Sequence, residues 1–111
     1  MLSGKKLTLK RREQNVADLV VRAILDHSRL EIVLSSDPKR TTRKVEPYAC
    51  YDSRGEPMLS VYQTEGYTSS SLGWKTIKVA KIESISILFG SFDLRDGYNP
   101  DYYKNVLIKI G

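Results

Sequence analysis

GWKTIKVAKIESISILF, residues 73–89, is the part of this 111-residue chain that most clearly indicates its fold. If residues 74–79 are extended, even-numbered and odd-numbered side chains lie on opposite sides, because strand side chains repeat every two residues. The alternation stops at residues 80–83, where we expect a tight turn. It resumes at residues 85–89, which are rich in isoleucine. The segment therefore predicts two short strands joined by one turn.

Three lysines, Lys75, Lys78 and Lys81, recur every third residue in this segment. They would place three cations on or beside a small sheet. In a regular strand Lys75 and Lys78 point to opposite faces, so their side chains meet only if a bulge or a strong twist separates them. The functional interpretation below requires such a meeting.

Length and composition indicate one globular domain of ordinary apolar content. No apolar run approaches the roughly 20 residues of a membrane helix. The N-terminal charges are not followed by the apolar region of a secretory signal. We therefore expect a cytoplasmic protein without a membrane partner. The single cysteine, Cys50, excludes an internal disulfide and indicates a small buried thiol.

The net charge of +5 arises in a basic N-terminal arm, residues 1–12, which contains five basic residues and no acid. The rest of the chain is neutral overall. Such an arm can contact phosphates, but charged arms are also common as solubilising tails. The sequence leaves both open.

Residues 13–28 have the apolar spacing of an amphipathic helix, with an acid in the first turn where the helix dipole favours it. His27 ends the apolar stripe, and since no other ligand stands at metal-binding spacing, we expect it to be structural. The stripe comprises Val16, Leu19, Val20, Ala23 and Ile24, widened by Val21 and Leu25.

Three further strands are predicted over residues 30–35, 43–51 and 58–63. Pro47 cannot donate to a ladder, so the second strand should lie at a sheet edge or carry a bulge. Asp52–Gly55 reads as a hairpin turn. One helix followed by five short strands indicates a mainly β protein built as a small antiparallel barrel.

The C-terminal residues are harder to assign. Asn99-Pro100 suits a helix start, which favours a short closing helix over residues 101–110. The apolar residues from Val106 to Ile110 also suit a strand. We expect a basic arm (1–12), a helix with a barrel (13–92) and a C-terminal extension (93–111).

Two segments resemble the WYL-domain family of bacterial regulators. Residues 43–47, RKVEP, are similar to the R-x-V-x-P strand of that family, and a hairpin ending at Gly55 follows. Residues 73–82, GWKTIKVAKI, are similar to its G-W-R-T-F-R-hydrophobic-D-R-I segment. The resemblance extends from roughly residue 16 to residue 92.

The chain also departs from the family pattern. The name-giving triplet falls on Pro57-Met58-Leu59, so only the leucine is kept. Lysines replace the family's arginines, Ala80 replaces its aspartate, and Leu34 replaces the tyrosine of its first strand. Lysine keeps the charge but loses the planar fork that grips a phosphate with two hydrogen bonds.

The resemblance implies a five-stranded Sm-like barrel behind an N-terminal helix, acting as a ligand-sensing module for single-stranded nucleic acid or a nucleotide-like anion. The family's winged-helix DNA-binding segment has no counterpart here. We therefore expect a module that stands alone or acts through a separate DNA-binding or effector protein, in transcription or defence against foreign DNA. A second copy of the chain is a further partner that this interpretation admits.

Cations and aromatic rings form the expected binding site, in which phosphates meet the cations and unstacked bases meet the rings. Each residue also has an ordinary structural role open to it, as a solvated lysine, a core ring or a surface ion pair. The candidate residues are Arg43, Lys75, Lys78, Lys81, Tyr62, Tyr67 and Trp74, with Tyr48 as a further aromatic platform.

We expect no enzymatic activity, cofactor or metal, because the sequence contains no nucleophile–base pair, metal-ligand spacing or phosphate-binding glycine loop. An alternative function is a protein-interaction module that docks a partner through the sheet edge near Pro47 and through the tyrosine-rich tail. Salt-dependent oligonucleotide binding separates the two.

Overall fold

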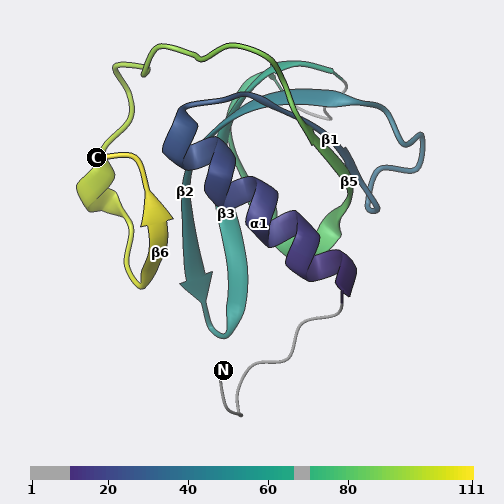
Figure 1. Ribbon diagram of the computed structural model, residues 1–111, viewed down its shortest axis with the longest axis horizontal. Coiled ribbons are helices and arrows are strands. Elements are labelled where there is room, and N and C mark those ends of the chain that lie inside the picture. The colour runs from purple at the N-terminus through teal and green to yellow at the C-terminus, as the bar shows by residue number, and fades with distance from the viewer. Residues whose placement is uncertain (1–10, 67–70) are drawn as a thin grey trace.

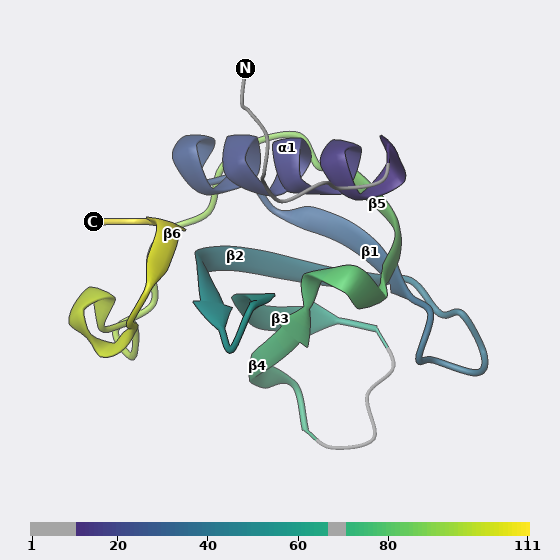
Figure 2. The same cartoon turned by 90° about the horizontal axis from the view of Figure 1, so that it is seen from below.

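The computed structural model describes residues 11–66 and 71–111, and its single α-helix lies across one face of an antiparallel sheet (Figures 1 and 2). The strand order is β4-β3-β2-β1-β5, with β6 paired to β2. The elements are α1 (Arg11–Asp26), β1 (Leu30–Leu34), β2 (Arg43–Ser53), β3 (Glu56–Glu65), β4 (Gly73–Lys78), the 3₁₀ turn η1 (Val79–Lys81), β5 (Ile82–Ile87), the 3₁₀ turn η2 (Pro100–Tyr102) and β6 (Val106–Lys109).

Helix α1 confirms the predicted amphipathic helix, and its buried residues Val16, Val20 and Ile24 complete the core of the sheet. The apolar stripe is narrower than predicted, however. Val21 and Leu25 lie on the outer flank of the helix with 39% and 66% of their surface exposed. Apolar side chains on that flank cannot reach a sheet that covers only one side. No helix in the described ranges is long and apolar enough to cross a bilayer.

Residues 73–87 form two strands joined by the short turn η1, as predicted, but β4 and β5 do not pair with each other. They lie at opposite ends of the strand order, and no ladder joins them in the described part of the chain. The closed Sm-like barrel is therefore not confirmed, and the architecture is an open antiparallel sheet covered by one helix.

Strand β2 is central rather than an edge strand. Two features of its pairing accommodate Pro47, which has no N–H to donate to a ladder. Its pairing with β3 shifts register between Pro47 and Ala49, which is the bulge that the sequence predicted as one alternative. Its other side is shared, because β1 pairs as far as Val45 and β6 begins at Ala49. Pro47 lies in the gap between them, where neither ladder requires its missing N–H.

The C-terminal helix expected over residues 101–110 is not confirmed. The helix-start signal at Asn99 is real, since its side chain accepts from the Asp101 N–H at 3.0 Å, but it caps only the turn η2. Strand β6 follows, in which Ile108 lies opposite Cys50. The free side of β2 gives the β-branched residues Val106 and Ile108 a strand to pair with. Strand pairing therefore prevails over the local helix-start signal.

Candidate functional site

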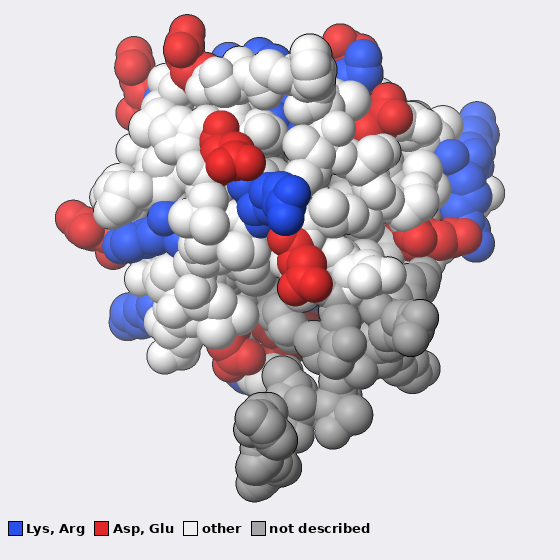
Figure 3. Space-filling view, in the orientation of Figure 1, with Lys and Arg blue, Asp and Glu red and all other residues white. Residues whose placement is uncertain are grey.

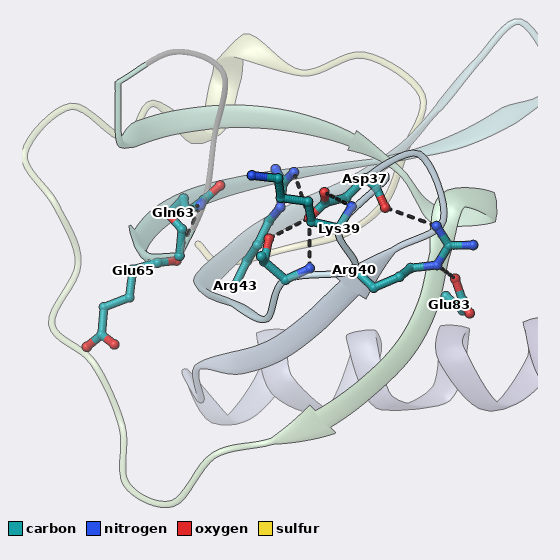
Figure 4. A network of polar contacts seen from close by, with 9 residues as sticks. Asp37, Lys39, Arg40, Arg43, Gln63, Glu65 and Glu83 are labelled. Atoms are coloured by element: carbon teal, nitrogen blue, oxygen red, sulfur yellow. Dashed lines mark hydrogen bonds and ion pairs between the residues drawn. The ribbon is translucent and has the colours of Figure 1, made fainter.

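Arg43, the first predicted binding residue, is engaged by a buried carboxylate (Figure 4). Asp37 is only 2% exposed and accepts from the backbone N–H groups of Lys39 and Thr41, both at 2.9 Å. The Thr41 hydroxyl also donates to it, and this bond is the main reason why the pKa of Asp37 lies below its ordinary value. The Arg43 guanidinium stands 3.9 Å from the same carboxylate. Arg43 thus helps to hold the loop after β1.

The same loop is tied to the far end of the sheet. Arg40 forms an ion pair with Glu83 of β5, with 2.7 Å between Nε and Oε1 (Figure 4). The guanidinium of Arg40 also donates to the Asp37 carbonyl at 3.0 Å. These contacts give the basic loop residues a structural role.

The three predicted lysines do not share one patch with Arg43. Ladder β3–β4 runs from the Met58–Lys78 pair to the Gln63–Gly73 pair without a bulge, so Lys75 and Lys78 stay on opposite faces of β4. Lys78 forms an ion pair with Glu56 at 3.7 Å, and Lys81 is exposed on η1. The meeting of the Lys75 and Lys78 side chains that the sequence interpretation required therefore does not occur. Separate binding roles for these residues stay predictions. Tyr67, the predicted loop aromatic, lies outside the described residues.

Two of the predicted aromatic residues do meet. Tyr62 and Trp74 are directly opposite each other on β3 and β4, with ring centroids 5.3 Å apart in an edge-to-face arrangement. They lie on the outer face of the β2–β3–β4 segment, which we define as the side opposite the core residues Val61 and Ile77. Trp74 is 40% exposed. It therefore presents aromatic surface to a ligand.

Arg95 covers this pair from the C-terminal segment. Its guanidinium carbon lies 3.8 Å from the centroid of the Tyr62 ring, a cation–π distance. Its Nε and Nη2 donate to the two carboxylate oxygens of Glu46, at 2.9 and 3.1 Å. This fork raises the pKa of Arg95 above its ordinary value. Arg95, Tyr62 and Trp74 form the arginine–aromatic row, the centre of the candidate site.

The carboxylate of Glu46 is 2% exposed, and its neighbours compensate its burial. The Tyr48 hydroxyl donates to it at 3.2 Å and accepts from the backbone N–H of Arg95 at 3.0 Å. Burial is the main reason why the pKa of Tyr48 rises to about 12. Arg29 adds a weaker ion pair at 3.8 Å. Tyr48 itself packs against Trp74 at 4.9 Å, so it supports the row from beneath rather than acting as an exposed platform.

A cleft of about 320 Å³ adjoins the row on the side of Arg95. Three part-exposed cations, Arg29, Lys44 and Arg95, border it. The fully exposed Phe89 ring stands at its margin. Two carboxylates also border the cleft, Glu46 within the buried fork and Glu65, which pairs with Lys44 at 3.5 Å. The cleft combines cations with an aromatic ring.

A second pocket of about 360 Å³ adjoins the row on the side of Trp74. One wall is formed by the sheet and the other by the C-terminal segment. The sheet contributes Tyr51, Ser60, Trp74, Lys75 and Thr76, and the C-terminal segment contributes Gly97, Asn99, Tyr102 and Tyr103. The row therefore lies between the cationic cleft and this aromatic pocket.

No group of three or more His, Cys, Asp or Glu side chains within the described residues is placed to hold a metal ion. Cys50 lies on β2 opposite Ile108 of β6 and is buried, and this burial raises its pKa to about 11. A thiol with such a pKa is a weak nucleophile at neutral pH.

Comparison with solved structures shows that the fold is shared with a bacterial protein, proteasome accessory factor B/C (PafBC) of Arthrobacter aurescens. The TM-score is 0.61 at 19% sequence identity, and the match covers 78% of this chain but only 13% of PafBC. At this level of identity the likeness shows a shared fold and nothing more. No family model matches the chain, and no curated protein matches it by sequence.

Proposed function

We propose that the chain is a ligand-sensing regulatory module that binds single-stranded nucleic acid or a nucleotide-like anion on its outer sheet face. The observation that carries this proposal is the arginine–aromatic row, with a cationic cleft on one side and an aromatic pocket on the other. Alternating cations and exposed rings suit a strand whose phosphates and bases must be contacted in turn.

Different residues of this face would contact the bases and the phosphates of the ligand. Trp74 and Phe89 offer exposed ring surface on which bases stack, worth about 1–3 kcal/mol per base. Arg95 uses two of its five N–H groups on Glu46, which leaves others for a phosphate. Lys44 and Arg29 add charge beside it. In contrast, the face that carries α1 mixes cations and carboxylates (Figure 3), so it offers no field of one sign.

The regulatory part of the proposal rests on resemblance. The segments around Arg43 and Trp74 resemble the WYL-domain family, and PafBC shares the fold. We propose that ligand binding on the outer face is transmitted to a separate DNA-binding or effector protein, and that the module itself catalyses no reaction.

One observation favours the alternative, a protein-interaction module. Strand β6 pairs only with β2 in the described part of the chain, and Leu107 on it is 63% exposed. A partner strand could add to this edge. Two tail tyrosines are engaged within the chain, since Tyr103 bonds to Ser60 at 2.7 Å and Tyr98 bonds to the Ile110 carbonyl, whereas Tyr102 is 75% exposed.

Fluorescence anisotropy with a labelled oligothymidylate tests the proposal. If Arg29, Lys44 and Arg95 each neutralise one phosphate, the logarithm of the association constant should fall with the logarithm of salt concentration with a slope of about −2. Lys44→Glu should weaken binding and flatten this slope, whereas the matched exposed control Lys104→Glu should leave both unchanged. Absence of oligothymidylate binding at low salt would refute nucleic-acid binding and favour the alternative.

A further inference from the structure

The pocket between the outer sheet face and the C-terminal segment is built from two parts of the chain that are far apart in sequence. Tyr103 bridges them, because its hydroxyl shares a hydrogen bond of 2.7 Å with Ser60 and its ring lies 5.3 Å from that of Tyr51. Trp74 is held from the other side by the backbone of Gly97, where an added Cβ would approach the indole Nε1 to 3.1 Å. Two independent contacts therefore hold the walls together, and the pocket exists before any ligand arrives.

Rings dominate the lining of this pocket. Trp74 and Tyr102 are 40% and 75% exposed, and they come from different segments, β4 and η2. Large aromatic side chains with this much free surface have unused stacking capacity. A planar ring is the shape of ligand that two such walls accommodate.

Polar groups lie between the rings. The hydroxyls of Ser60 and Thr76 and the amide of Asn99 border the pocket. Ser60 already shares a hydrogen bond with Tyr103, and the Asn99 oxygen accepts from the Asp101 N–H, but a hydroxyl and an amide each keep further donor or acceptor capacity. No carboxylate belongs to its lining residues, and Lys75 is the one charged residue among them. The surroundings thus suit a neutral ring with donors and acceptors on its edge, and they do not repel an attached phosphate.

The volume of the pocket further limits the ligands that it can hold. A volume of about 360 Å³ is near the lower end of the range for small-molecule sites, roughly 300–1,000 Å³. It suits one heteroaromatic ring with its sugar and excludes a helix or a folded peptide. The pocket is also next to Trp74, which belongs to the arginine–aromatic row.

From these observations we infer that the pocket binds a single nucleobase, which stacks between Trp74 and Tyr102 and directs its polar edge toward Ser60, Thr76 and Asn99. The inference rests on the proposed function, because a strand or nucleotide on the row would bring one base to the mouth of the pocket. It adds a separate site for that base, distinct from the cationic cleft beside Phe89.

Trp74 is the single tryptophan of the chain, so its fluorescence reports directly on this pocket. The full chain is titrated with adenosine and with uridine, which carry no charge. We expect saturable quenching by at least one of them that is insensitive to salt. Tyr102→Ala should weaken this binding about tenfold, since one stacking surface is lost. Leu25→Ala, which truncates an exposed apolar side chain on α1 outside the pocket, should leave it unchanged.

The outcomes separate this inference from the proposed function. If oligothymidylate binds with the expected salt dependence but neither nucleoside quenches saturably, the base pocket is refuted and the proposed function stands. Quenching that Tyr102→Ala leaves unchanged likewise refutes the pocket. If nucleosides bind as expected but oligothymidylate does not bind even at low salt, the inference stands and the nucleic-acid function falls.

Discussion

Arg95 and Glu46 are 49 residues apart in sequence, yet their side chains form a two-pronged ion pair with bonds of 2.9 and 3.1 Å. This pair fastens the C-terminal segment to the central strand β2. It also places the Arg95 guanidinium over Tyr62, where the candidate site begins. One contact therefore serves both the fold and the site.

Loss of this pair should destabilise the protein. Arg95→Ala leaves the Glu46 carboxylate buried with the Tyr48 hydroxyl and the more distant Arg29. Because Arg95 is itself part-exposed, we expect a moderate loss of about 2 kcal/mol in the free energy of unfolding, measured by urea denaturation. Arg22→Ala on the exposed face of α1 is the control and should change stability by less than about 0.5 kcal/mol. Equal effects of the two would show that the pair does not anchor the segment.

Gly66 should tolerate no side chain. Its φ is +104°, and an added Cβ would lie 2.4 Å from the Thr42 carbonyl oxygen. Gly55 in the β2–β3 turn has a φ of +83° with nothing within 4 Å of the added carbon, so it isolates the conformational cost. We expect Gly55→Ala to cost about 1 kcal/mol and Gly66→Ala at least about twice as much. Thermal unfolding of both variants measures this, and similar costs would contradict the close approach.

The Asp37 network should make stability depend on acid pH. Because the folded pKa of Asp37 lies below its ordinary value of 3.8, its ionised form stabilises the fold at higher pH. That contribution should be lost as the pH falls below about 4 and through the folded pKa. Thr41→Val removes the main cause of the shift and should raise the pKa of Asp37, as measured by NMR titration of its carboxyl carbon. An unchanged pKa would show that the Thr41 hydroxyl is not its cause.

The thiol of Cys50 should be unreactive in the folded protein. It is 8% exposed, and with a pKa of about 11 only about one thiol in a thousand is ionised at pH 8. We expect slow reaction with a disulfide reagent in buffer and fast reaction in denaturant. The Cys50→Ser variant, which has no thiol, gives the background signal of the reagent. Fast labelling in buffer would mean that β6 readily leaves β2.

Much of the fold could be predicted because its signals are local. The side-chain period of residues 73–89 predicted two strands and a turn. Pro47 predicted either an edge strand or a bulge, and the structure contains the bulge. The C-terminal strand was only the alternative to a favoured helix, because its pairing depends on a free side of β2, which no neighbouring residue reveals. The Asn99 cap is present, but it caps a single turn.

The candidate site was predictable by residue type more than by position. Tyr62 and Trp74 were named from their chemistry, and the ladder does place them opposite each other. Arg95 and Glu46 gave no signal, because each is an ordinary charged residue until the chain brings them together. The ion pair of Arg43 with Asp37 was easier to predict from the sequence. Asp37-Pro38 is a turn signal, and the carboxylate in such a turn commonly accepts hydrogen bonds from nearby N–H groups.

The most direct test of the account is to map oligothymidylate binding by NMR on uniformly labelled protein. We predict that the largest shift changes fall on the Trp74 indole N–H, the Arg95 side chain and the residues around Phe89, and that added salt reverses them. Changes confined to α1 or to the edge of β6, or none at all, would contradict a binding site on the outer face of β2–β4.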